Sequence, residues 1–217
     1  ARGLVVAGAP HRVLEVEGYL VTADHPDPFA HAHPEQATDD RWYLHRVGVG
    51  FRGGSYKGLD LTFGGPRGLG GLLVRTLETP DGRIVSGPSL VVDHLLEALG
   101  AADPAALHRR LGPADAPGPL RLGPASDAAT SDAARERCAL GIVWTARVGL
   151  SLRRTARDPA LVEPMQRFFG RHYRAVDAPH RIPKGRAQMT VALHQGGASV
   201  AEIVARLGGR ARHHEAL

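Results

Sequence analysis

The sequence predicts an α+β fold, a curved antiparallel β-sheet with flanking helices in a single domain. Over about the first 80 residues, apolar and polar side chains alternate in short runs separated by glycine-rich turns, which is typical of antiparallel strands. The second half of the chain instead spaces its apolar residues as helices do, between serine, proline and glycine boundaries. With 217 residues, we expect a domain over residues 1–178 and a basic C-terminal extension over 179–217 with a short amphipathic helix.

The first expected strand spans residues 12–21 and has two acids and a tyrosine on one face. That face is Val13, Glu15, Glu17 and Tyr19, and the opposite face is Leu14, Val16 and Leu20. A proline-rich loop follows over residues 22–34. Further strands are expected at 42–51, 56–63 and 71–77, with glycine turns at 53–54 and 64–71.

The expected helices begin after residue 86. In the first, residues 90–100, Ser86 or Ser89 is placed to cap the N-terminus and Pro88 suits the first turn. Other helices are expected at residues 104–111, 159–169 and 198–207, and a surface loop at 114–127. The segment 195–210 is also similar to the second helix of a helix-turn-helix, but an amphipathic closing helix is the favoured interpretation.

The charge balance favours a polyanionic partner. Lysine and arginine number 27 against 22 acidic residues, and nearly all of these cations are arginines, whose guanidinium groups grip phosphates at two points. A genome rich in arginine codons explains the charge alone equally well. No run of about 18 apolar residues occurs, so we expect no membrane span. The single cysteine, Cys138, excludes an internal disulfide and favours a reducing, cytoplasmic compartment.

Glu17 is the leading catalytic candidate. An arbitrary strand glutamate is more often an exposed surface residue, but Gly18 marks a place where a ligand can approach the backbone closely. Tyr19 projects from the same face. Arg75 is the lone charge in an apolar strand and is the natural counter-charge for Glu17, either in a structural ion pair or as support for a water-activating carboxylate.

The histidine-rich loop raises the question of a metal. Its candidate ligands are Asp24, His25, His31 and His33. The loop is interrupted by prolines and offers no clear fourth ligand, so we expect neither a metal nor another cofactor. Stacking on a base or contact with a phosphate is the favoured role for His31.

Aromatic residues and cations interleave between residues 41 and 57. Such a mixture is expected where an unstacked base meets its flanking phosphates, although aromatic residues in strands are more often core. The mixed set is Arg41, Trp42, Tyr43, Arg46, Phe51, Arg52, Tyr56 and Lys57. Lys57 also has the chemistry of a Schiff-base nucleophile, but nothing in the sequence indicates that it is desolvated.

Five short motifs, in order, resemble those of the alkyladenine (3-methyladenine, methylpurine) DNA glycosylases. They are VEGYL at 16–20, DPFAH at 27–31, LLVRTLE at 72–78, SGPS at 86–89 and RVGL at 147–150. The resemblance implies a monomeric, cytoplasmic and nucleoid-associated base-excision repair enzyme. Its partner would be double-stranded DNA carrying a damaged base, and its reaction hydrolysis of the N-glycosidic bond of an alkylated or deaminated purine.

The resemblance also assigns roles to single residues. Glu17 would be the general base for water, with Arg75 supporting it. Tyr19 and His31 would sandwich the flipped base, and the backbone near Leu150 would help to bind the water. Contacts to DNA are expected from Tyr56, Lys57, Arg46, Arg52 and Arg147.

The chain departs from the family pattern at one hairpin. In the family this hairpin supplies the residue that wedges into the duplex and ends in an asparagine that helps to reject guanine. Here Tyr56 is the candidate wedge, no asparagine follows it, and Thr62 is the nearest polar substitute. The departure leaves two alternatives open, a non-catalytic nucleic-acid-binding relative and a nucleosidase with a retargeted pocket.

Overall fold

The computed structural model describes residues 2–124 and 141–209. It confirms the predicted α+β class, since a curled antiparallel sheet with flanking helices accounts for most of the described chain. The chain divides into two compact units, residues 1–128 and 129–217. The boundary expected after residue 178 stays a prediction. Cys138 and the end of the expected loop at 114–127 lie outside the described residues.

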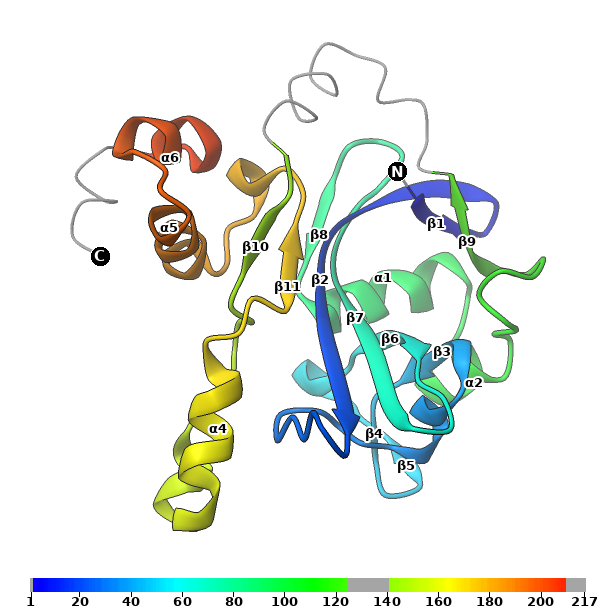
Figure 1. The fold of residues 1–217 in the computed structure, drawn as a ribbon. Coiled ribbons are helices and arrows are strands. Elements are labelled where there is room, and N and C mark those ends of the chain that lie inside the picture. The colour runs from blue at the N-terminus through cyan, green and yellow to red at the C-terminus, as the bar shows by residue number, and fades with distance from the viewer. Residues whose placement is uncertain (1, 125–140, 210–217) are drawn as a thin grey trace. The chain divides into compact units, whose positions relative to one another are not determined.

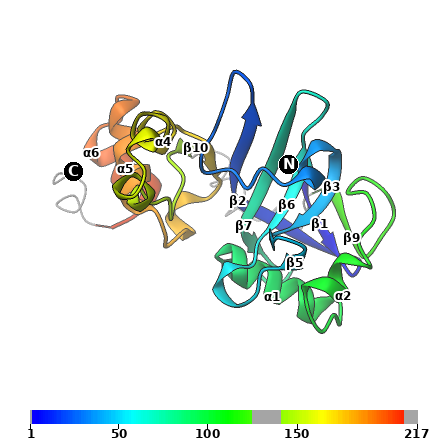
Figure 2. The same ribbon diagram turned by 90° about the horizontal axis from the view of Figure 1, so that it is seen from below.

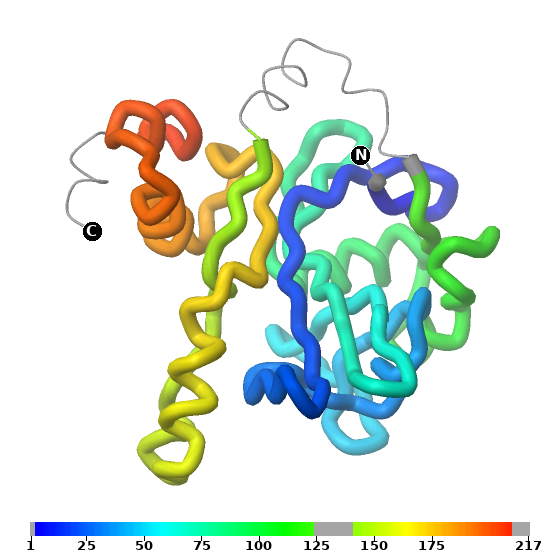
Figure 3. The backbone as a smooth tube through the Cα atoms, in the orientation of Figure 1, coloured from blue at the N-terminus to red at the C-terminus, as the bar shows by residue number. Residues whose placement is uncertain are grey.

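The first unit is built around a long antiparallel pair of strands that are far apart in sequence. These strands, β2 (Ala9–Thr22) and β7 (Gly68–Glu78), run side by side through their length (Figures 1 and 3). On the far side of β7, the sheet continues through β6 (Leu59–Phe63) to β3 (Asp39–Leu44). Further strands pair where β2 begins and β7 ends: β1 (Arg2–Val6) pairs with β2 and with β9 (Leu120–Pro124), and β8 (Ile84–Ser86) pairs with β7.

A β-bulge at Glu15 changes which residues of β2 project from the same face of the sheet. The register shifts on both sides of Glu15, which pairs with Thr76, while the next residue pairs with Val74. As a result, Val13 and Val16 line one apolar cavity of about 280 Å³. The prediction that Val13 shares a face with Glu15 is therefore wrong, because strict alternation does not survive an inserted residue.

Two helices cover one side of this sheet, α1 (Pro88–Ala98) and α2 (Pro104–His108) (Figure 2). Helix α1 buries Val91, Val92 and Leu95 in the core of the unit. Pro88 opens the helix as expected, but the N-cap is Gly87, with φ of 123° and no side-chain cap. The predicted serine cap is wrong, because Ser89 instead donates a hydrogen bond to the carbonyl of Gly54.

A small β-hairpin extends from the sheet after β3. It consists of β4 (Arg46–Val47) and β5 (Gly50–Phe51), and a 3₁₀ turn, η2 (Gly54–Tyr56), leads from it toward β6. The strand expected over residues 42–51 is thus interrupted at His45. Another 3₁₀ turn, η1 (Pro34–Ala37), precedes β3.

The second unit combines one strand pair with helices. The strands β10 (Val143–Thr145) and β11 (Arg174–Val176) pair in antiparallel fashion. Between them lie the turns η4 (Arg153–Ala156) and η5 (Pro159–Leu161) and the helix α4 (Val162–Phe169). After a turn, η6 (Pro179–Arg181), come α5 (Arg186–Gln195) and α6 (Val200–Leu207). The last matches the predicted amphipathic helix, and its N-terminus is closed by a capping box of Ser199 and Glu202.

Candidate active site

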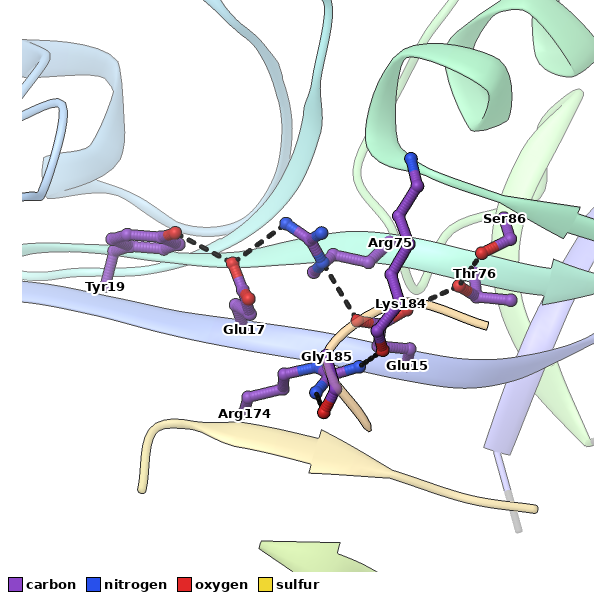
Figure 4. Close-up of polar contacts among 9 residues, drawn as sticks. All are labelled: Glu15, Glu17, Tyr19, Arg75, Thr76, Ser86, Arg174, Lys184 and Gly185. Atoms are coloured by element: carbon purple, nitrogen blue, oxygen red, sulfur yellow. Dashed lines mark hydrogen bonds and ion pairs between the residues drawn. The ribbon is translucent and has the colours of Figure 1, made fainter. Parts of the chain in front are cut away.

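The carboxylate of Glu17 is held by two neighbours on its own face of the sheet. The Tyr19 hydroxyl donates to Glu17 Oε2 over 2.8 Å, and Arg75 Nη1 donates to the same oxygen over 3.1 Å (Figure 4). Glu17 is fully buried, and only 7% of Arg75 is exposed. The predicted pairing of Glu17 with Arg75 and Tyr19 is confirmed as a set of direct contacts.

Glu15 completes the cluster from the other side of Arg75. Arg75 Nε donates to Glu15 Oε1 over 3.0 Å, and the Thr76 hydroxyl donates to Glu15 Oε2 over 2.5 Å. One guanidinium group therefore bridges two buried carboxylates. Such a group is stable only when its donors are satisfied by well-placed acceptors.

The two carboxylates of this cluster change the pKa of Arg75. Burial by itself lowers the pKa of Arg75, but the charges of Glu17 and Glu15 outweigh it, so that the pKa is raised above its ordinary value. Arg75 thus remains a fixed cation beside both carboxylates. This arrangement can orient the Glu17 carboxylate and keep a positive charge next to it through a reaction.

A second polar group lies across β7 from Glu17. Glu17 and Asp60 both pair with Leu73, one from each side, so their side chains project from the same face. Asp60 is buried, with His45 Nε2 at 2.9 Å from Oδ1 and Gln36 Nε2 donating to Oδ2 over 3.0 Å. The polar residue in register with Glu17 is therefore Asp60. Thr62 bonds to the backbone of Arg41 instead.

Gly71 makes room for this second group. A Cβ at Gly71 would lie 2.5 Å from Asp60 Oδ2 and 2.6 Å from Gln36 Nε2, closer than real contacts allow. Gly71 pairs with Tyr19 on one side and Thr62 on the other. The glycine in this strand therefore lets the Gln36–Asp60 pair lie over the sheet beside the Tyr19 side chain.

His31 lies at the edge of the Asp60 group. Its ring is 4.2 Å from that of His45, centroid to centroid, and the residue keeps an exposed side. Partial burial, followed by the charge of His45, lowers the pKa of His31 to about 4, although Asp60 opposes the shift. At neutral pH the ring is therefore uncharged, a form that can stack on a base or accept a hydrogen bond.

Two of the expected DNA contacts lie on the segment after the small hairpin. Tyr56 is 72% exposed at the end of η2. Lys57 is mostly buried and forms an ion pair with Asp93 on α1, with Nζ 2.8 Å from Oδ1. The lysine is therefore engaged within the unit, while the tyrosine ring faces solvent.

Arg46 and Arg52 hold the hairpin together. Arg46 pairs with Glu35 at 3.0 Å and stacks over the Phe51 ring at 3.9 Å. Arg52 Nε donates to the Arg46 carbonyl over 3.2 Å. Contact of these two arginines with DNA stays a prediction.

Leu150 and Arg147 belong to the second unit, and the water-binding role expected near Leu150 and the DNA contact expected from Arg147 stay predictions. Leu150 is half-buried and follows Gly149, whose φ is 83°. Arg147 is buried, with its guanidinium carbon 5.4 Å from the centre of the Tyr173 ring.

Three residues of the site escape prediction from sequence. They are Gln36 in η1, His45 directly after β3, and Asp60 in β6. These residues are far apart in the local sequence pattern and come together only in the folded sheet. One signal was present, since Asp60 is an acid between two leucines in an expected strand. An acid at a core position indicates a buried, partnered group.

The fold and the site together define an α+β protein in which a buried Glu–Arg pair contacts a half-buried tyrosine on one face of the sheet. A search of protein-family models finds none that matches the chain. The chain is similar to uncharacterized protein L759 of Acanthamoeba polyphaga mimivirus, with 31% identity over 43% of this chain and 50% of the viral protein. It thus spans about half the length of that relative, whose description states no activity.

Proposed function

We propose that this chain is a monofunctional DNA glycosylase that removes damaged purines by hydrolysing the N-glycosidic bond. The observation that carries the proposal is the contact of Glu17 with Tyr19 and Arg75 on one sheet face. These three residues are the ones that the motifs at 16–20 and 72–78 single out by their resemblance to the alkyladenine DNA glycosylases.

In the proposed reaction, Glu17 is the general base. Cleavage of the glycosidic bond develops positive charge on the sugar, and a carboxylate at this point stabilises that charge and takes a proton from the attacking water. Arg75 and Tyr19 fix the orientation of the carboxylate through their bonds to Oε2. The bond to the base breaks, the water oxygen bonds to the sugar carbon, and the base leaves with the bonding electrons.

The surroundings of Glu17 favour a purine made cationic by alkylation over a neutral, deaminated one. Glu15, Glu17 and Asp60 project from one region of the sheet, and one cation, Arg75, is shared by the two glutamates. A cationic base is attracted to such a face and departs as a neutral molecule. His31, uncharged at neutral pH, adds a ring for stacking without adding repulsion.

A panel of duplexes with one lesion each tests the proposal. We expect multiple turnovers that leave abasic sites on at least one duplex with an alkylated purine, and none on the matched undamaged duplex. Activity on free nucleosides but not on duplexes would favour the nucleosidase alternative. Tight binding with no turnover on any lesion would favour a non-catalytic relative. No borohydride-trapped adduct is expected, because the proposed route forms no Schiff base.

A further inference from the structure

The second unit carries an arginine-bearing arm, defined here as residues 153–171. It comprises η4, η5, α4 and the two residues after α4, and in Figure 1 it extends from the ends of β10 and β11 away from α5 and α6. Its cations are Arg153, Arg154, Arg157, Arg167 and Arg171, all exposed, and its acids are Asp158 and Glu163. None of these cations figures in the proposed chemistry at Glu17.

Three of the arginines crowd one helical turn. Arg153 and Arg154 open η4, and Arg157 is its C-cap. Residues three and four apart on a helical turn are neighbours, and like charges at that spacing repel by about 0.2–0.5 kcal/mol per pair. The nearest acid in sequence, Asp158, accepts a bond from the Ala160 amide as the cap of η5. The turn therefore places three exposed positive charges close together.

The other two arginines of the arm serve its folding. Arg171 Nε donates to the carbonyl of Arg167 at the C-terminal end of α4 over 3.2 Å. Arg167 lies in the last turn of that helix, where a cation is favoured by the helix dipole. Met165 and Phe168 of this helix are buried, and the Arg167 guanidinium carbon lies 5.5 Å from the centre of the Phe168 ring. The closest cluster of exposed arginines in the arm is therefore Arg153, Arg154 and Arg157.

We propose that Arg153, Arg154 and Arg157 bind backbone phosphates of duplex DNA, a role distinct from the chemistry proposed at Glu17. A close set of guanidinium forks suits consecutive phosphates, each of which accepts two parallel hydrogen bonds. The choice of duplex DNA among polyanions rests on the proposed function, whereas the anion-binding role rests on the charges of the turn.

The test compares the DNA affinities of two variants that have the same net charge. The probe is an undamaged, fluorescein-labelled duplex, and binding is measured by fluorescence anisotropy. The NaCl concentration is varied from 50 to 300 mM, roughly the range in which phosphate contacts respond to salt. The variant is Arg153→Ser, Arg154→Ser and Arg157→Ser together. The control changes three exposed arginines of the first unit, Arg67, Arg109 and Arg110, to serine. Because the duplex is undamaged, the result does not depend on excision.

For the arm variant we expect the salt slope of log K to become shallower by about 2 to 3, at about 0.9 for each lost phosphate contact. Replacing the same three residues by lysine keeps the charge and should keep most of the slope, which separates charge loss from misfolding. An equal effect in arm variant and control would overturn the proposal, because it would reflect net charge alone. So would unchanged DNA affinity with lost binding to phosphatidylserine vesicles, which would assign the arm to a membrane surface.

Discussion

Arg75 reaches Glu17 diagonally across the β2–β7 pair, since the residue in register with Glu17 is Leu73. The bulge at Glu15 carries the register from Val74 to Thr76 and leaves Arg75 opposite the irregular part of β2. From there its guanidinium group contacts both carboxylates at once. The bulge is therefore the feature of the backbone that builds the cluster.

Loss of Arg75 should destabilise the protein strongly, because it leaves two buried carboxylates without their counter-charge. We expect Arg75→Leu to lower the free energy of unfolding in urea by about 3–5 kcal/mol. Adding Glu15→Gln and Glu17→Gln to this variant removes both charges and should recover much of the loss. If the triple variant is no more stable than Arg75→Leu, the cost does not come from uncompensated charge.

Gly71→Ala should be costly for a steric reason. The new methyl group meets Asp60 and Gln36, and overpacking of this kind costs about 1–3 kcal/mol. Gly112→Ala is the matched control, because a Cβ there meets nothing within 4 Å and its φ needs no glycine. Urea unfolding of both variants checks this, and equal stabilities would show that the Gln36–Asp60 pair does not depend on Gly71.

A pair of histidines should make the first unit sensitive to acid. His11 Nε2 and His94 Nε2 are 2.9 Å apart, and only one of the two can carry the proton between them. Burial, followed by the charges of His11 and Arg83, lowers the pKa of His94 below its ordinary 6.5, although Glu97 and Asp81 oppose the shift. The native state therefore prefers neutral His94, and this contribution to stability is present above pH 6.5 and is lost as the pH falls below it.

Replacing this residue by a neutral amide tests the histidine pair. We expect His94→Gln to flatten the decline in unfolding free energy between pH 7 and 5, since glutamine takes up no proton. His172→Gln, at an exposed position, is the control and should follow the wild type. A wild-type decline in the His94→Gln variant would assign the acid sensitivity to other groups.

Tyr56 should matter for duplex DNA and little for stability. Its ring is 72% exposed, so Tyr56→Ala should change the unfolding free energy by less than about 0.5 kcal/mol. Under the proposed function the variant loses excision from duplexes more than from single strands, because only the duplex needs a wedge. Val49→Ala is the control, at the hairpin tip where Val49 is 96% exposed. If Val49→Ala alone loses duplex activity, the hairpin tip and not Tyr56 is the wedge.

The local sequence pattern was enough to predict the contacts between two neighbouring strands, β2 and β7. The alternation of Glu15, Glu17 and Tyr19 and the lone charge of Arg75 predicted the contacts now found at Glu17. The bulge was not predictable, because no glycine or proline marks it in the sequence around Glu15. It moved Val13 to the other face.

The local sequence pattern could not predict contacts between residues on strands that are far apart in sequence. Asp60 meets His45 and Gln36 only because β6 and β3 take one particular register, and a slip of one residue would reverse the faces. The prediction of a serine N-cap for α1 was wrong for a related reason. Ser89 found a partner in Gly54, far away in sequence, and Gly87 became the N-cap.

In the described part of the chain, no helix combines the length and apolar content needed to cross a bilayer. The expectation of a monomeric, nucleoid-associated enzyme stays a prediction. Its decisive element is the chemistry at Glu17, since every proposed role in excision depends on that carboxylate.

The most direct test of that chemistry is single-turnover excision of an alkylated purine from a duplex by Glu17→Gln, with Glu15→Gln as the matched control. Both variants remove one buried charge beside Arg75, so they share the structural effect. We predict that Glu17→Gln loses excision by at least about 10²-fold while duplex affinity is kept, and that Glu15→Gln retains most of the rate. Excision by Glu17→Gln at the wild-type rate would contradict the assignment of Glu17 as the general base.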